Sequence, residues 1–155
     1  MFCFAAKAQT VVGVDTIWKS GPISNRINIV ILGDGYDNTE TAKLVTDATN
    51  TSTFVLNNAP FIFYQNYFNV FVIKCVSPQS GITHPGTATD VSEPASPVTS
   101  VTNYFNTGFD SYNIHRLMVP VNGTAIFNVL STWFPAYSQV VVLGNTPEYG
   151  GSGGF

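Results

Sequence analysis

Apolar residues of this chain gather in four short runs, at 27–32, 68–76, 115–121 and 138–145. The first run is the most regular, because five of its six residues are aliphatic and only Asn28 interrupts them. Short apolar runs rich in β-branched residues are typical of strands in a sheet that is covered on both faces. The pattern therefore predicts four strands of a buried sheet.

Polar segments between the runs contain the signals expected of helices. The first run ends in the turn Gly33-Asp34-Gly35, and Asp37 and Glu40 then have the spacing of a capping box, with Asp37 as the N-cap. We expect helices at 37–57, 97–105 and 128–134.

Strands that alternate with helices indicate an α/β fold, with a mostly parallel twisted sheet and flanking helices. Asp34 lies at the carboxyl end of the first strand, where the functional sites of such sheets gather. A carboxylate at the start of a turn also commonly caps the backbone amides that follow it. We interpret Asp34 as a structural residue of this kind rather than a catalytic one.

Composition excludes two classes of partner. Only 10% of the residues are charged, the net charge is −3, and the six basic residues are scattered along the chain. This pattern predicts no nucleic-acid partner. No apolar run approaches the 18 residues that indicate a transmembrane helix, so we expect no membrane span.

The N-terminus has the pattern Ala6-Lys7-Ala8, which is typical of a signal-peptide cleavage site. We interpret residues 1–8 as the remnant of a signal peptide, with an ordinary N-terminal segment as the alternative, and residues 9–24 as a lead-in to the domain at 25–155. A signal peptide would place the protein outside the cytoplasm, secreted or in the cell envelope (periplasm or cell surface). Cys75 lies in an apolar strand, which favours a buried, inert thiol.

Several familiar sites do not fit the residues. Gly33 and Gly35 resemble the start of a dinucleotide-binding motif, but Asn38 occupies the position of its third glycine. The two histidines, His84 and His115, lie far apart in sequence, and zinc needs three or four converging ligands. We therefore expect His84 to be a surface turn residue, His115 to be structural, and this chain to hold no metal.

A glycine-rich segment follows the last predicted strand. Glycines in a strand-like segment let another backbone approach closely, and an edge strand can add an extended peptide as a further strand. A flexible tail is the alternative interpretation. The candidate substrate-binding residues are Tyr149, Gly150, Gly151, Ser152, Gly153 and Gly154.

Six segments together resemble the IgA-peptidase-like zinc metallopeptidases of secreted bacterial proteins. They cover most of the chain from residue 25, in the order found in the family, and the one departure is Asp37, where a threonine is expected. The matching segments are RINIVILGDGY at 26–36, FNVFVIK at 68–74, SGITHPGT at 80–87, YFNTGFD at 104–110, HRLMVPV at 115–121 and FPAYSQVVVLGNTPEYGGSGG at 134–154.

The resemblance implies a metzincin-like (zincin) catalytic domain, whose outermost strand runs along a cleft that binds an extended peptide or protein substrate. It also implies a catalytic zinc on a helix with the motif H-E-x-x-H, where the glutamate acts as general base. This sequence contains no such motif. We therefore expect residues 25–155 to be the N-terminal part of a catalytic domain truncated before its zinc-binding helix, inactive alone, with zinc held elsewhere in the parent protein. The alternative is a complete, non-enzymatic secreted module that binds peptide or glycan through an exposed sheet edge.

Overall fold

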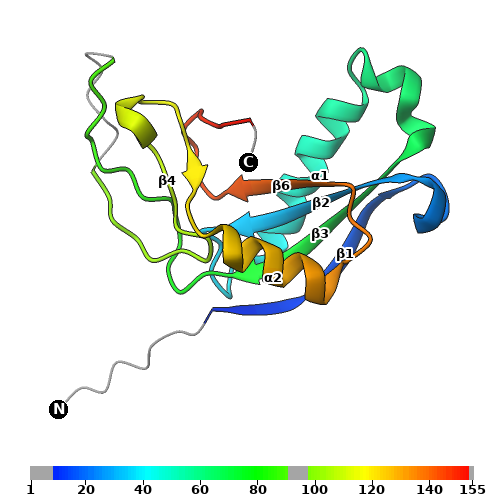
Figure 1. The fold of residues 1–155 in the computed structure, drawn as a ribbon, viewed down its shortest axis with the longest axis horizontal. Coiled ribbons are helices and arrows are strands. Elements are labelled where there is room, and N and C mark those ends of the chain that lie inside the picture. Colours follow the sequence, from blue (N-terminus) through cyan, green and yellow to red (C-terminus); the bar gives the residue numbers. More distant parts are fainter. Residues whose placement is uncertain (1–8, 91–97, 154–155) are drawn as a thin grey trace.

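Three of the predicted strands pair with one another in the computed structural model, which describes residues 9–90 and 98–153 (Figure 1). They are β2 (Ile27–Asp34), β3 (Phe68–Val76) and β6 (Gln139–Gly144). β2 lies between the other two and is parallel to both. The α/β class is confirmed, and Asp34 is the last residue of β2, as the sequence predicts.

A fourth strand, β1 (Thr10–Lys19), completes the sheet in the order β1-β3-β2-β6. β1 is antiparallel to β3, so the sheet is mixed, with two parallel pairs and one antiparallel pair. The interpretation of residues 9–24 as a lead-in is therefore wrong for most of that segment. β1 is an edge strand with exposed and half-buried positions. It contains no long apolar run from which a strand could have been predicted.

Two helices cover opposite faces of the sheet (Figure 1). On one face, α2 (Gly123–Trp133) packs Ile126, Val129 and Leu130 against a cluster that includes Val30 and Leu32 of β2. On the other face, α1 (Thr41–Leu56) packs Leu44, Ala48 and Leu56 against Ile31 of β2 and two valines of β3. Successive residues of β2 thus point to opposite layers, which explains why the strand is apolar on both faces.

α1 begins three residues later than the capping-box pattern predicts, because the residue before its first helical position is Glu40 and not Asp37. The Asp37 side chain accepts a bond from the Thr39 amide at 2.8 Å, and the Glu40 carboxylate accepts one from the Asp37 amide at 3.0 Å. These bonds close a turn before the helix instead of capping its first residues. The prediction that Asp37 is the N-cap is therefore wrong, because Glu40 precedes the first helical residue, Thr41.

Two further predicted elements are absent or reduced. The described part of 97–105 is irregular rather than helical, because the amides of Tyr104 and Phe105 bind Asp34 instead of a helical carbonyl. The predicted strand at 115–121 is reduced to β5 (Val119–Pro120), which pairs with β4 (Thr107–Gly108) in a separate small sheet. Three short 3-10 helices complete the described elements: η1 (Ile23–Asn25), η2 (Phe61–Tyr67) and η3 (Ser111–Asn113).

The remaining predictions have mixed outcomes. The predicted helical segment at 128–134 belongs to the longer α2, which starts at Gly123 because the Asn122 side chain accepts a bond from the Ala125 amide at 3.1 Å. Cys75 is fully buried, as expected. The interpretation of residues 1–8 lies outside the described residues. No helix among the described residues has the length and apolar character to cross a membrane.

Candidate functional site

Asp34 fastens a distant loop to the carboxyl end of β2. Its buried carboxylate accepts backbone bonds from Tyr104 at 2.6 Å, from Phe105 at 3.1 Å and from Thr107 at 3.2 Å. It also accepts bonds from the hydroxyls of Ser77 and Thr107 and from the amide of Gly35. A carboxylate with this many donors has no lone pair left for a reacting group. The geometry therefore supports the structural interpretation of Asp34.

The turn after Asp34 brings a second loop to the same place. Gly35 has a φ of 74°, and its carbonyl accepts a bond from the Gly81 amide at 2.8 Å. A Cβ atom at Gly35 would collide with the Gly81 carbonyl oxygen, so glycine is required there. The loop that follows β3 is consequently held against the turn, and His84 lies three residues further along this loop.

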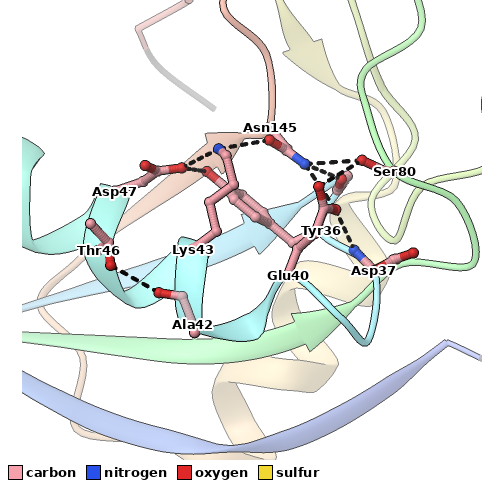
Figure 2. Close-up of polar contacts among 10 residues, drawn as sticks. Tyr36, Asp37, Glu40, Ala42, Lys43, Thr46, Asp47, Ser80 and Asn145 are labelled. Atoms are coloured by element: carbon pink, nitrogen blue, oxygen red, sulfur yellow. Dashed lines mark hydrogen bonds and ion pairs between the residues drawn. The ribbon is translucent and has the colours of Figure 1, made fainter.

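A polar network joins both loops to the residue that follows β6 (Figure 2). The Asn145 side-chain amide donates to the Gly35 carbonyl at 2.9 Å, to the Glu40 carboxylate at 3.0 Å and to the Ser80 hydroxyl at 3.2 Å. The Lys43 ammonium donates to the Asn145 side-chain oxygen at 3.0 Å. The path of the chain after β6, towards Glu148 and the glycines, is therefore set by these contacts.

Tyr36 connects this polar network to the hydrophobic cluster beneath α1. Its hydroxyl donates to the Asp47 carboxylate at 2.9 Å, and the Lys43 ammonium lies 5.1 Å from the centre of its ring. Burial raises the pKa of Tyr36 well above its usual range, and the bond to Asp47 adds to the effect. Burial likewise raises the pKa values of Cys75 and of Tyr104. All three groups therefore remain protonated at neutral pH.

A groove of about 560 Å³ runs along β6. All six consecutive residues of β6 line it, which shows that it follows the edge of the strand rather than one face. The opposite wall contains Met118, Pro120 and residues 149–153. In the described part of the chain no strand pairs with this edge of β6.

The orientation of β6 determines which backbone groups face the groove. The Asn145 amide, directly after the strand, donates to the Asp34 carbonyl of β2 at 2.9 Å. Because alternate residues of a strand direct their polar groups to opposite edges, the N–H and C=O groups of Val140 and Val142 point to the open side. The groove thus offers backbone donors and acceptors in the spacing that an extended peptide uses.

The candidate substrate-binding residues form one wall of this groove, although they are not a strand. Tyr149–Gly153 have no regular secondary structure, and the edge strand is β6 instead. The Gly151 amide donates to the Arg116 carbonyl at 3.0 Å, and Tyr149 is 79% exposed. The sixth candidate, Gly154, lies outside the described residues. The structure thus brings the other five candidates together beside β6.

The individual glycines of this wall differ in what surrounds them. A Cβ atom at Gly150 would collide with the Phe109 ring and would lie 3.0 Å from the Arg116 carbonyl. A Cβ atom at Gly151 or Gly153 would meet nothing within 4 Å. Gly150 is therefore needed for packing, whereas Gly151 and Gly153 leave open space beside the groove.

The two histidines lie beside Glu148, the residue that directly precedes this glycine-rich wall. His84 and His115 are only 3% and 4% exposed, and their rings lie 5.4 Å apart in an edge-to-face arrangement. One oxygen of Glu148 lies 3.4 Å from Nε2 of His84 and 3.2 Å from Nε2 of His115. The prediction that His84 is a surface turn residue is wrong, and so is the argument that the histidines lack a converging third ligand.

Asp110 completes the surroundings of this cluster. Its Oδ1 atom lies 3.5 Å from Nδ1 of His115 and 3.9 Å from Nε2 of His84. Its Oδ2 atom accepts bonds from the amides of Thr87 at 2.7 Å and Ala88 at 3.2 Å. Sequence spacing gave no sign of the cluster, because its four side chains come from three separate loops. No signal in the sequence could have found it, because His115 stands at the start of the predicted strand at 115–121 and His84 lies in a loop 31 positions earlier.

Comparison with known proteins identifies the family. A family model described as IgA Peptidase M64 matches residues 16–155. This chain belongs to the IgA peptidase M64 family. The match extends from within β1 to the glycine-rich wall, so it includes the groove and the histidine cluster. No curated protein matches the chain.

The peptidases of the M64 family are zinc-dependent. In the metzincin arrangement that the sequence resemblance implies, zinc is held by two histidines one helical turn apart, with a glutamate between them. His84 and His115 lack that spacing, and neither lies in a helix. The residues of this chain therefore do not fit a helix-borne zinc site, although His84, His115 and Glu148 form a ligand set of another kind.

Proposed function

We propose that this chain is the substrate-binding part of a secreted, zinc-dependent endopeptidase with a metzincin-like catalytic domain. Its sheet is the scaffold, and the open edge of β6 holds an extended peptide or protein substrate. The proposal rests chiefly on the groove along β6, which combines a sheet edge that no described strand covers with a glycine-rich wall. Membership of the IgA peptidase M64 family supports it independently.

The groove suits an extended peptide for a physical reason. A peptide that adds to a sheet edge gains main-chain hydrogen bonds that do not depend on its sequence, and pockets for alternate side chains supply specificity. Val140 and Val142 would provide those bonds from β6. The small wall residues Gly151, Ser152 and Gly153 permit close approach from the other side. A peptide held in this way is fixed in register, which is the main contribution of a substrate cleft to peptide hydrolysis.

Hydrolysis itself requires a group that this sequence does not contain. When bound to an H-E-x-x-H helix, zinc activates the attacking water and polarises the scissile carbonyl. The sequence has no such motif, so we assign the zinc-binding helix to residues of the parent protein outside these 155. The role of this chain is to bind the substrate, orient it and keep it extended.

A protease assay on the protein encoded by the complete gene tests the proposal. Unstructured peptides should be cleaved internally, cleavage should stop with 1,10-phenanthroline, and added zinc should restore it. Mass spectrometry of the products identifies the cleaved bonds. If the complete reading frame lacks H-E-x-x-H and its purified product cleaves no peptide, the alternative holds, namely a non-enzymatic module that binds peptide or glycan on the same edge.

A further inference from the structure

We propose that His84, His115 and Glu148 bind one divalent transition-metal ion, with zinc as the occupant. Among the described residues these three form a group of potential ligands whose donor atoms all lie within 4.8 Å of one another. Two imidazoles and one carboxylate are a common zinc ligand set in proteins. Nothing in this proposal depends on the peptidase function.

The distances within the cluster match those between ligands of one ion. Zinc bonds of about 2.0–2.1 Å in a tetrahedral arrangement separate neighbouring ligand atoms by roughly 3.3 Å. The Glu148 oxygen lies 3.4 Å from Nε2 of His84 and 3.2 Å from Nε2 of His115. Both separations agree with a shared metal, and the imidazole nitrogens of the two histidines lie within 4.8 Å of each other.

His84 supplies the second, independent observation. It is 3% exposed, and within the described residues neither of its ring nitrogens has a hydrogen-bond partner. The Glu148 oxygen is close to Nε2, yet the pair does not have hydrogen-bond geometry. A metal explains this arrangement, because ligand atoms point towards the ion and not towards one another. A buried imidazole without partners otherwise carries a desolvation cost that folding has to overcome.

Asp110 is a further buried carboxylate beside the cluster, and its Oδ1 atom has no hydrogen-bond partner among the described residues. Its Oδ1 atom lies 3.5 Å from Nδ1 of His115, on the side of the ring opposite the proposed metal-binding nitrogen. Metal-binding histidines commonly direct their other nitrogen to a carboxylate, which fixes the ring and raises its basicity. Asp110 has a φ of 57°, an uncommon conformation for an aspartate, and its amide contacts with the Thr87–Ala88 loop hold it there.

The cluster is reachable from solvent. A pocket of about 250 Å³ is lined by His84 and Glu148 together with Phe109 and the loop at 145–147. Three protein ligands leave one position of a tetrahedral ion free, and a water from this pocket can occupy it. Magnesium and calcium prefer oxygen ligands, so two imidazoles select against them.

A metal at this position would join three segments that are distant in sequence. His84 comes from the loop after β3, His115 from the segment between η3 and β5, and Glu148 from the segment after β6. Glu148 directly precedes the glycine-rich wall of the groove. Metal binding would therefore fix the wall relative to β6, and removing the metal would loosen it.

Zinc titration of the 155-residue chain tests the site. The chain must carry no histidine tag, because His84 and His115 are its only histidines. After treatment with EDTA and dialysis, calorimetry with zinc chloride should give about one ion per chain, with a Kd near or below micromolar. Zinc should also raise the Tm, whereas magnesium at the same concentration should not.

Three variants locate the ion. Glu148→Gln keeps the size of a partly exposed side chain and should weaken zinc binding at least tenfold, and His84→Ala should do the same. Asp15→Asn is the matched control, because it removes a carboxylate that pairs with Lys74 on β3, away from the cluster, and its zinc affinity should equal that of the wild type. Circular dichroism confirms that each variant is folded. Failure of the folded wild-type chain to bind zinc would overturn the proposal, as would unchanged affinity in folded Glu148→Gln.

Discussion

Asp34 is the residue on which the loops of this domain depend most. Its carboxylate satisfies backbone amides of Tyr104, Phe105 and Thr107 in a fully buried position. Asp34→Ala would leave these donors buried without acceptors, so we expect it to lower the free energy of unfolding by about 3–5 kcal/mol. Asp34→Asn keeps one acceptor oxygen and should cost less. Urea unfolding followed by circular dichroism measures both, and an Asp34→Ala variant as stable as the wild type would contradict this role.

Cys75 should make the stability of the domain sensitive to alkaline pH. Burial raises the pKa of its thiol, and the nearby Asp34 carboxylate adds to the shift. The unfolded chain therefore releases this proton first, above a pH of about 9.0, so the stabilising contribution is present below that pH and is lost as the pH rises. In Cys75→Ala this loss is absent. The difference in unfolding free energy between wild type and variant should shrink by about 1 kcal/mol between pH 8 and pH 10. A constant difference would contradict the prediction.

At the scale of elements, Asn145 connects β6 to the turn after β2 and to the start of α1. Asn145→Ala removes three donated bonds, so we expect it to lower the free energy of unfolding by about 1–3 kcal/mol. It should also increase amide hydrogen exchange at 146–150. Lys43→Ala is the control from the same network (Figure 2), because its ion pair with Asp47 is exposed and should contribute less than about 1 kcal/mol. Equal effects of the two variants would show that Asn145 does not anchor this segment.

The elements that could be predicted are those whose own residues determine their form. β2, β3 and β6 are mostly apolar runs, and α1 has an apolar stripe, so their existence follows from local pattern. β1 was missed because an edge strand mixes polar and apolar residues, as with Asp15, which pairs with Lys74 of β3. The predicted helix at 97–105 is wrong because the contact with Asp34, about seventy positions away in sequence, decides the conformation of Tyr104 and Phe105.

The candidate site also has one part that the sequence predicts and one part that depends on contacts between distant segments. The glycine-rich wall could be predicted from the sequence, because glycines carry no side chain that would keep another backbone at a distance. The cluster of His84, His115 and Glu148 is not visible, because each residue comes from a different loop and only the sheet brings the loops together. Asp110 adds a further reason, since its place near His115 depends on a backbone conformation that aspartate seldom adopts.

At the scale of the whole molecule, the groove along β6 lies at one edge of the three-layer domain. α1 and α2 cover opposite faces of the sheet, and β1 and β6 are its two edge strands (Figure 1). The edge along β6 faces the groove. Everything that holds the residues after β6 in place, including Asn145 and the proposed metal, also shapes this groove. The central claim is that this edge binds the substrate of a peptidase.

The most direct measurement of that claim is kcat/KM for peptide cleavage by the complete gene product carrying Gly151→Val. A Cβ atom at Gly151 meets nothing within 4 Å, and Gly151 lines the groove, so we expect the variant to fold and its side chain to narrow the groove. Gly123→Val is the matched control, because a Cβ atom there also meets nothing within 4 Å and Gly123, at the start of α2, is not among the residues that line the groove. With equal zinc content in all proteins, Gly151→Val should lower kcat/KM roughly ten- to a hundred-fold, about 1.4–2.8 kcal/mol of transition-state binding. Gly123→Val should leave it unchanged. Wild-type activity in Gly151→Val would contradict the assignment of the groove as the substrate site.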